Sequence, residues 1–306
     1  MTRDVACPEV PWFEGDDVEA YLGRSGFDAE TEAFVRDLAR DGYAMVDLGD
    51  QARALCDRAI ADTEPYFARK GGVNRVQDAW FRSRAVRRLA SWPRMHALLQ
   101  AAYGRRGFPF QTLNFKRGSQ QALHPDSIHF HSQPERFMCG VWIALEDVKP
   151  GAGALVYRPG SHRLPVLTMQ DVGINAERPG PEHYESAFVT RFAERIEAAG
   201  LPTEHAMVKK GWAFVWAANL AHGGSAIADP QSTRRSLVVH WYFEDCVYYT
   251  PMTSDVAAGR LKLRLPIDVG AGRWVWPRRG GGAVWPGNKP VIAAILNRIL
   301  RRPFLE

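Results

Sequence analysis

The sequence predicts a mainly β protein with flanking helices, built on a jelly roll, the double-stranded β-helix in which two antiparallel sheets face each other. Segments rich in β-branched and aromatic residues dominate residues 110–250, which indicates strands. Pro-Gly turn signals occur between them, at 149–151 and 158–160. Residues 28–103 show mainly helical apolar spacing instead. A double sheet of this kind leaves a mouth that can hold a metal.

Length and composition are those of one globular domain with a sizeable core, since 46% of the 306 residues are hydrophobic and 24% are charged. We expect a single catalytic domain over 1–306, with a mainly helical part at 1–105 and the jelly-roll core at 106–250. An insertion at 163–204 interrupts the core, and a basic, Trp- and Gly-rich tail at 251–306 ends in an amphipathic helix.

The helical part comes first in the chain. Residues 28–43 have apolar side chains at helical spacing, and a short strand is expected at 44–48. Asp50 is placed to cap a second helix that runs to Phe67, and a third is expected over 85–103, bent near Pro93. We expect these helices to cover one face of the sheet.

The expected strands lie in five stretches of the core. Within the insertion, the segment SAFVTRFAERIEAAG at 186–200 is amphipathic and helical in pattern, and it could cover the substrate as a lid or simply pack on the core. The strand stretches are 111–118 (QTLNFKRG), 135–148 (ERFMCGVWIALEDV), 153–159 (GALVYRP), 205–216 (HAMVKKGWAFVW) and 234–249 (RRSLVVHWYFEDCVYY).

Candidate metal ligands stand at His124-Pro125-Asp126. Alternation along an extended chain puts residues i and i+2 on one face, so this imidazole and carboxylate can converge on one point. Two imidazoles and one carboxylate are the ligands of non-haem Fe(II) oxygenases, so the pattern demands a distant second histidine. His222 qualifies, because it ends an apolar strand and two glycines after it allow backbone or ligand to approach closely. Arg234 and Arg235 open the next strand, where an arginine could clamp a carboxylate.

Four motifs in this order resemble the phytanoyl-CoA dioxygenase family of Fe(II)- and 2-oxoglutarate-dependent oxygenases: HPD at 124–126, GALVYRPGSH at 153–162, AHGGS at 221–225 and TRRS at 233–236. The resemblance implies that His124, Asp126 and His222 ligate Fe(II). It also implies that Arg234 binds the distal carboxylate of 2-oxoglutarate, with Ser225 as a helper. Arg235 is the alternative to Arg234, although strand alternation sends its side chain to the opposite face.

Some alternatives stay open at this stage. His129 and His131 could form a rival ligand set, and His240 shares strand parity with Arg234 and so could line the same cavity. The spacing from His222 to Arg234 is one residue longer than the family pattern leads us to expect, which a different turn length absorbs. Asp126 disfavours halogenation, because related halogenases lack this carboxylate.

The implied reaction uses Fe(II), 2-oxoglutarate and O2 to hydroxylate an unactivated C–H bond of a small-molecule, acyl or natural-product substrate, free or carrier-bound, with release of succinate and CO2. A cupin-like metal-dependent hydrolase or isomerase is the alternative enzyme class, and it would not need the arginine that follows the distal histidine. We expect no nucleic-acid partner, because no recognition motif accompanies the basic tail.

The tail carries most of the excess positive charge of this chain, whose formal net charge is +5. Its last segment, 291–302, places apolar residues on one face and arginines off it. Packing on its own domain is the favoured interpretation, and contact with an anionic membrane or a partner is the alternative. Scattered cysteines and the lack of a signal peptide pattern predict a cytoplasmic protein without disulfides.

Overall fold

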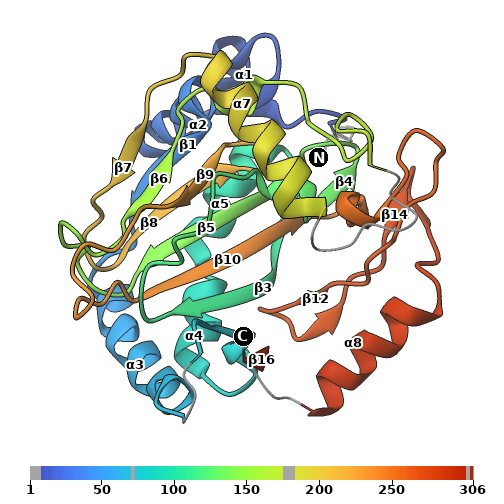
Figure 1. Ribbon diagram of the computed structural model, residues 1–306. Coiled ribbons are helices and arrows are strands. Elements are labelled where there is room, and N and C mark those ends of the chain that lie inside the picture. The colour runs from blue at the N-terminus through green and yellow to red at the C-terminus, as the bar shows by residue number, and fades with distance from the viewer. Residues whose placement is uncertain (1–7, 70–72, 175–182, 301–303, 306) are drawn as a thin grey trace.

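The computed structural model describes residues 8–69, 73–174, 183–300, 304 and 305, and its centre is a seven-stranded antiparallel sheet (Figure 1). The order across this sheet is β1-β8-β5-β10-β3-β2-β16. The strands are β1 (Tyr43–Asp47), β8 (Trp212–Ala217), β5 (Met138–Ala144), β10 (Ser236–Phe243), β3 (Gly107–Phe115), β2 (Arg75–Gln77) and β16 (Phe304–Leu305).

A smaller three-stranded sheet faces the large one and completes the jelly-roll core that the sequence predicts. Its strands are β7 (Glu204–Ala206), β6 (Leu155–Tyr157) and β9 (His222–Gly224), in that order. A buried apolar layer fills the space between the two sheets and includes Trp142, Leu155, Phe214 and Val238. Strand β4 (His131–Gln133) pairs with β11 (Val247–Tyr249), and the short pairs β12 (Ile267–Asp268) with β13 (Arg273–Trp274) and β14 (Arg278–Arg279) with β15 (Gly282–Ala283) lie in the tail.

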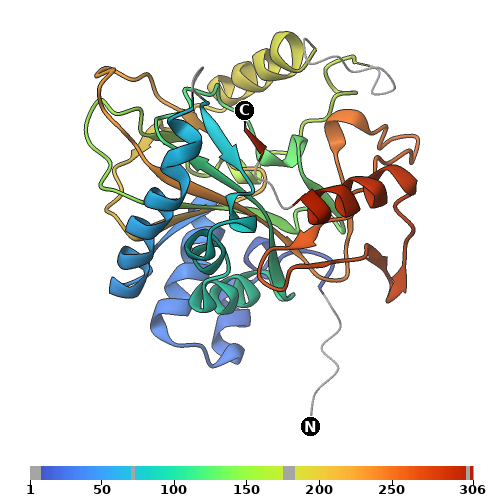
Figure 2. The same cartoon turned by 90° about the horizontal axis from the view of Figure 1, so that it is seen from below.

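Helices cover the other face of the large sheet, as Figure 2 shows from below. Strict alternation along β10 explains the two faces: Leu237, Val239 and Trp241 belong to the core shared with the helices, whereas Val238 and His240 face the other way. The helices are α1 (Val18–Ser25), α2 (Ala29–Asp41), α3 (Asp50–Phe67), α4 (Arg84–Ala90) and α5 (Pro93–Tyr103).

Two predictions about the helices are wrong in detail. The segment 85–103 forms two helices rather than one bent helix, because Pro93 occupies the first turn of α5 and Trp92 before it is extended, with ψ 126°. Asp50 does not cap α3, because Gly49 holds the N-cap position with φ +79° and Asp50 is already helical. The strand expected at 44–48 begins and ends one residue earlier, as β1.

The insertion folds over the smaller sheet and beside the mouth of the jelly roll. A single π-helical segment (Tyr184–Val189) leads into α7 (Thr190–Ala198), and Phe188, Phe192 and Ile196 pack in a buried cluster with Ile128. Residues 175–182 of the insertion lie outside the described part of the chain.

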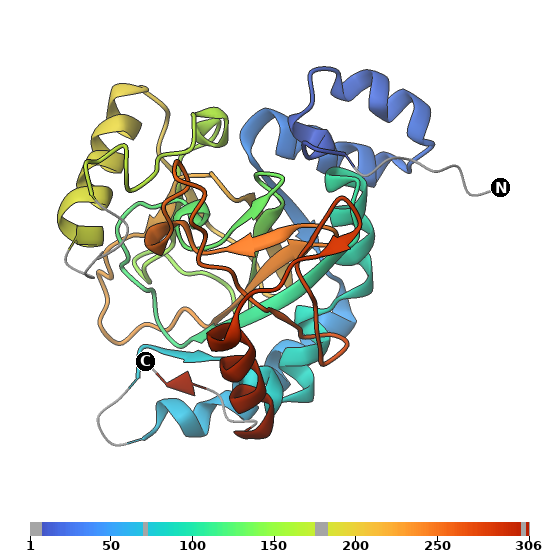
Figure 3. The ribbon, with the colours of Figure 1, turned by 90° about the vertical axis from the view of Figure 1, so that its right-hand side faces the viewer.

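The tail ends in α8 (Asn288–Leu300), which lies beside β12 at the open side of the large sheet (Figure 3). Packing of its apolar face on the domain, the favoured expectation, is wrong for most of the described side chains. Ala294 is buried, but Ile292, Ile295 and Leu296 are 54%, 37% and 50% exposed.

Within the described residues, no helix has the length and apolar character needed to cross a membrane. Cys56, Cys139 and Cys246 are buried and form no disulfide with one another, whereas Cys7 lies outside the described residues. The cytoplasmic location stays a prediction.

Candidate metal centre

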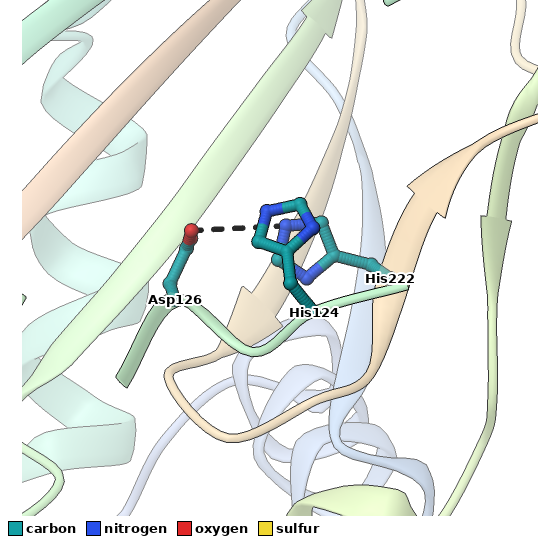
Figure 4. Close-up of side chains that lie close together, drawn as sticks. All are labelled: His124, Asp126 and His222. Atoms are coloured by element: carbon teal, nitrogen blue, oxygen red, sulfur yellow. Dashed lines mark ion pairs between the residues drawn. The ribbon is translucent and has the colours of Figure 1, made fainter. Parts of the chain in front are cut away.

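His124, Asp126 and His222 meet at the mouth between the two sheets (Figure 4). His222 is the first residue of β9, and His124 lies opposite it in an isolated antiparallel bridge. The His124 N–H donates to the His222 carbonyl at 2.9 Å, and the His222 N–H donates to the His124 carbonyl at 3.0 Å. These two backbone bonds hold both imidazoles side by side before any metal binds.

The glycines after His222 permit this close pairing. A Cβ at Gly223 would lie 2.7 Å from the Gln121 carbonyl oxygen, and one at Gly224 would lie 2.7 Å from the Gln120 nitrogen. Any other residue would push the 120–124 segment away from β9, so the expectation of a close backbone approach beside His222 is confirmed. The expectation of strand-like backbone through 126 holds only as far as Pro125, because Asp126 begins a 3₁₀ turn that runs to Ile128.

The three ligand groups offer atoms that all lie within 4.8 Å of one another. His124 Nδ1 is 2.8 Å from the Ala122 carbonyl oxygen, and His222 Nδ1 is 3.0 Å from that of Leu220. A carbonyl oxygen only accepts, so each Nδ1 carries the proton and each Nε2 keeps its lone pair for a metal. Burial, together with the neighbouring His222, lowers the pKa of His124 to about 3, which keeps this imidazole in the neutral form that binds metals.

Asp126 is the charged member of the site. Burial alone would raise the pKa of its carboxyl, but the nearby imidazoles of His222 and His240 and a hydrogen bond from Trp216 outweigh burial and lower that pKa to about 2. Trp216 Nε1 donates to Asp126 Oδ2 at 2.8 Å. The indole reaches across β5 only because residue 140 is glycine: a Cβ there would lie 2.2 Å from the Trp216 ring.

Arg234 extends into the same cavity, which has a volume of about 440 Å³. Arg234 is only 2% exposed, and its guanidinium carbon lies 5.3 Å from the centre of the Trp142 ring. Within the part of the chain that the structure describes, its buried Nε and Nη1 have no hydrogen-bond partner. Burial lowers its pKa to about 10, so the group stays charged at neutral pH. A buried cation with unused N–H donors is costly unless an anion pairs with it, and a ligand carboxylate would supply one.

Arg235, the alternative to Arg234, lies on the opposite face. Its Nη1 pairs with Glu64 Oε2 at 2.5 Å, and Lys116 shares the same carboxylate at 2.7 Å. Ser225, the expected helper, donates its hydroxyl to the Ala154 carbonyl at 3.0 Å and is not among the residues that line the cavity.

The other histidines separate into two groups. His129 and His240 line the cavity, and His240 Nε2 is 3.6 Å from Asp126 Oδ2 while its Nδ1 is 2.8 Å from Gln111 Oε1. The strand-parity expectation for His240 is therefore confirmed. His131 is buried against the Tyr249 hydroxyl at 2.9 Å and does not line the cavity.

Sequence reasoning missed the groups around these ligands. Trp216 has the strand parity of the site-facing residues of β8, but nothing in the sequence ties its indole to Asp126. Tyr184 reaches the cavity from the insertion, where its hydroxyl lies 3.0 Å from His129 Nε2. The insertion thus both packs on the core and contributes a wall of the cavity.

A jelly roll that presents two imidazoles and one carboxylate at its mouth defines the class of mononuclear non-haem iron proteins. The family model of phytanoyl-CoA dioxygenase (PhyH) matches residues 33–236, and the chain belongs to this family. The cofactors of this family are Fe(II), 2-oxoglutarate and O2. The site offers imidazole nitrogens and a carboxylate for the metal, and the Arg234 guanidinium for a carboxylate of a ligand.

Two curated relatives match part of the chain. Peroxisomal phytanoyl-CoA dioxygenase of Rattus norvegicus is 26% identical over 137 residues, and a probable phytanoyl-CoA dioxygenase of Caenorhabditis elegans is 24% identical over 140 residues. Each match covers 44% of this chain but only 36% and 40% of the respective relative. The chain therefore matches less than half the length of either protein.

Solved structures share the fold. The alpha ketoglutarate dependent epimerase SnoN from nogalamycin biosynthesis superposes with a TM-score of 0.56 at 21% identity, covering 86% of this chain and 97% of its own. EctD from S. alaskensis, solved with 2-oxoglutarate and 5-hydroxyectoine, gives 0.53 at 17% identity, covering 71% and 76%. At these identities the likeness establishes the fold.

Replacing Trp216 by Phe tests the support of Asp126. The variant keeps an aromatic six-membered ring but removes the pyrrole ring with its N–H, so we expect Fe(II) affinity to fall by about ten- to a hundred-fold, as is typical when a partner of a metal ligand is lost. Anaerobic titration calorimetry measures this. Trp241→Phe is the matched control, because the buried Trp241 Nε1 has no hydrogen-bond partner. Equal losses in both variants would contradict a specific role for the Trp216 N–H.

Proposed function

We propose that this protein is an Fe(II)- and 2-oxoglutarate-dependent dioxygenase that hydroxylates an unactivated C–H bond of a small-molecule, acyl or natural-product substrate and releases succinate and CO2. The observation that carries the proposal is the buried Arg234 guanidinium, which has no anionic partner among the described residues and lies in the same cavity as His124, Asp126 and His222. A metal site alone would not require such a cation.

Each residue has a definite task in this proposal. His124 and His222 bind Fe(II) through Nε2 and Asp126 binds it through a carboxylate oxygen, while Arg234 binds the distal carboxylate of 2-oxoglutarate. The bound iron and co-substrate supply the oxidising power for C–H cleavage. Trp142 and the apolar layer between the sheets exclude water around Arg234, which strengthens its attraction for the carboxylate.

The cupin-like hydrolase or isomerase remains the alternative. An enzyme of that class would not bind 2-oxoglutarate, so the co-substrate carboxylate would not pair with the buried Arg234 charge. The burial of this charge would then lower the stability of the fold without serving the reaction. Two similar structures, SnoN and SnoK, are described as an alpha ketoglutarate dependent epimerase and carbocyclase. Product analysis should therefore look for epimerised and cyclised products as well as for the alcohol.

Anaerobic addition of Fe(II) and then 2-oxoglutarate to metal-free protein tests the cofactor chemistry. We expect the weak visible charge-transfer band of the chelate, followed by slow succinate release in air. His222→Ala should abolish both, because one of three metal ligands is gone. Iron binding without the band would refute the 2-oxoglutarate assignment and favour the alternative enzyme class.

Arg234→Gln and Arg235→Gln distinguish the two arginines. Loss of a buried charged hydrogen bond at Arg234 should raise the 2-oxoglutarate concentration needed for half-maximal succinate formation by about 30-fold or more. The metal-free variant should also unfold at the same or a higher temperature, because an unpaired buried charge has been removed. Arg235→Gln should leave the 2-oxoglutarate requirement unchanged. The reverse pattern would transfer the role to Arg235.

We further propose that the tail makes peripheral contact with an anionic lipid surface. Trp285 is 60% exposed, and Ile292, Ile295 and Leu296, which follow it in the tail, are exposed apolar residues as well. Arg278, Arg279 and Lys289 are exposed in the same tail and would attract anionic headgroups.

A double variant, Ile292→Gln with Leu296→Gln, tests this contact. We expect it to co-sediment several-fold less with phosphatidylserine-containing vesicles, because the apolar anchor is lost while the charge is kept. Met207→Gln is the control, since Met207 is 50% exposed but lies outside the tail. Unchanged binding of the double variant, or equal binding to neutral vesicles, would refute the proposal.

A further inference from the structure

A second, larger cavity adjoins the metal cavity. It has a volume of about 820 Å³ and lies under α8, between the tail and strands β2 and β3. Four residues line both cavities: Gln77, Gln111, Thr250 and Arg264. These side chains therefore form a wall that the two cavities share, which we call the junction, and Arg264 is the cation at this junction.

Backbone pairing determines where Arg264 sits. The segment 262–264 runs antiparallel to the end of β11, with the Thr250 N–H donating to the Lys262 carbonyl at 3.1 Å and the Arg264 N–H to the Tyr248 carbonyl at 2.8 Å. The tail thus delivers Arg264 to the junction through a short ladder rather than through a free loop.

Aromatic rings and one hydroxyl surround the Arg264 guanidinium. Its central carbon lies 4.9 Å from the centre of the Phe130 ring and 5.9 Å from that of Phe110, and Nη1 donates to Thr250 Oγ1 at 3.2 Å. Its buried Nε has no partner. The planar group is held in place on the rings, and its other N–H donors are available for a ligand.

No carboxylate in the described part of the chain forms an ion pair with Arg264. Burial raises the pKa of Asp78 to about 6 although the Arg264 charge acts to lower it, so the two groups attract each other without an ion-pair contact. The hydrogen bonds of the Asp78 carboxylate come instead from the Thr112 N–H at 3.0 Å, from Trp80 Nε1 at 3.2 Å and from Gln77 at 3.3 Å. Arg264 therefore resembles Arg234 in one respect: neither cation forms an ion pair with a carboxylate of the described residues.

The outer cavity has a composition that suits an apolar molecule with a negative charge. Its charged lining residues are Lys262, Arg264 and Lys289 against Asp78 alone. Trp80, Phe81, Phe110 and leucines of the tail form an apolar wall, and the small Ala293 and Ala294 of α8 close it. An apolar body would fill this space, and its anionic group would reach a cation.

We propose that Arg264 binds the carboxylate of the substrate to be oxidised, and that this substrate is an apolar carboxylic acid whose body lies in the outer cavity beneath α8. The inference rests on the proposed function, since it names the substrate class of that site. Arg234 then binds the distal carboxylate of the co-substrate at the inner end of the metal cavity. Arg264 binds the carboxylate of the substrate at the junction.

Binding to metal-free protein tests the inference without turnover. Decanoate and 4-phenylbutyrate, each compared with its uncharged primary amide, are titrated by calorimetry in the presence of saturating succinate to occupy Arg234. We expect each acid to bind at least ten-fold more tightly than its amide. Arg264→Gln should remove this preference, and Arg264→Lys should restore part of it because the charge returns without the planar fork.

Two further variants test whether the acid preference depends on Arg264 and whether the apolar body of the ligand lies in the outer cavity. Arg279→Gln changes an exposed base of the tail that lines neither cavity, and it should keep the acid preference. Ala293→Phe narrows the outer cavity, and it should weaken decanoate by several-fold more than hexanoate. All variants should still form the band with Fe(II) and 2-oxoglutarate.

Several results would overturn the inference. They are equal binding of acid and amide, no binding of any acid, a preference that survives Arg264→Gln, or a preference lost in Arg279→Gln, which would indicate general attraction by the basic tail instead. A failed inference with an intact charge-transfer band would leave the proposed function standing. Absence of the charge-transfer band in the wild-type protein would refute the proposed 2-oxoglutarate-dependent function. The acid preference measured on metal-free protein would still be valid in that case.

Discussion

The reciprocal backbone hydrogen bonds between His124 and His222 are the constraint on which the site depends. They join a loop before a 3₁₀ turn to the first residue of a strand far away in the chain, and they place two imidazoles beside one carboxylate without help from a metal. Gly223 and Gly224 make the pairing possible, because no side chain fits between the two segments. Backbone carbonyls then orient both rings, and Trp216 across Gly140 orients the carboxylate. Preorganisation of this kind avoids an entropic cost when the ligands gather around a cation.

Charge is arranged around this centre in a simple pattern. The ligand carboxylate is balanced by neighbouring imidazoles, whereas Arg234 lies buried without a protein anion and Arg264 lies partly buried at the junction to the outer cavity, likewise unpaired within the described residues. Arg235 shows the contrast, since it faces the helices and is neutralised by Glu64. Among the described residues, Arg234 and Arg264 thus keep unpaired N–H donors toward the cavities, and under the proposed function these donors would bind acids.

Local patterns predicted much of the fold because they report on one element at a time. Enrichment in β-branched and aromatic residues in 234–249 and 205–216 located the inner strands β10 and β8, and helical spacing located α2 and α3. The split at Pro93 and the cap of α3 were wrong because short-range rules compete there: a proline can bend a helix or begin one, and Gly49 with φ +79° displaced Asp50 from the cap. The exposed apolar face of α8 was also misjudged, because periodicity alone does not tell what an amphipathic helix packs against.

The sequence by itself determined the fold class and supplied the candidates His124, Asp126, His222 and Arg234, the last preferred over Arg235 through the family resemblance and strand parity, because motifs and strand parity are local properties. Only the tertiary structure decided which groups support those residues and where a substrate can lie. Trp216, Gly140 and Tyr184 come from different elements, and Arg264 arrives from the tail through pairing with β11. Contacts of this kind depend on how sheets, insertion and tail pack in three dimensions, and no spacing along the chain encodes them.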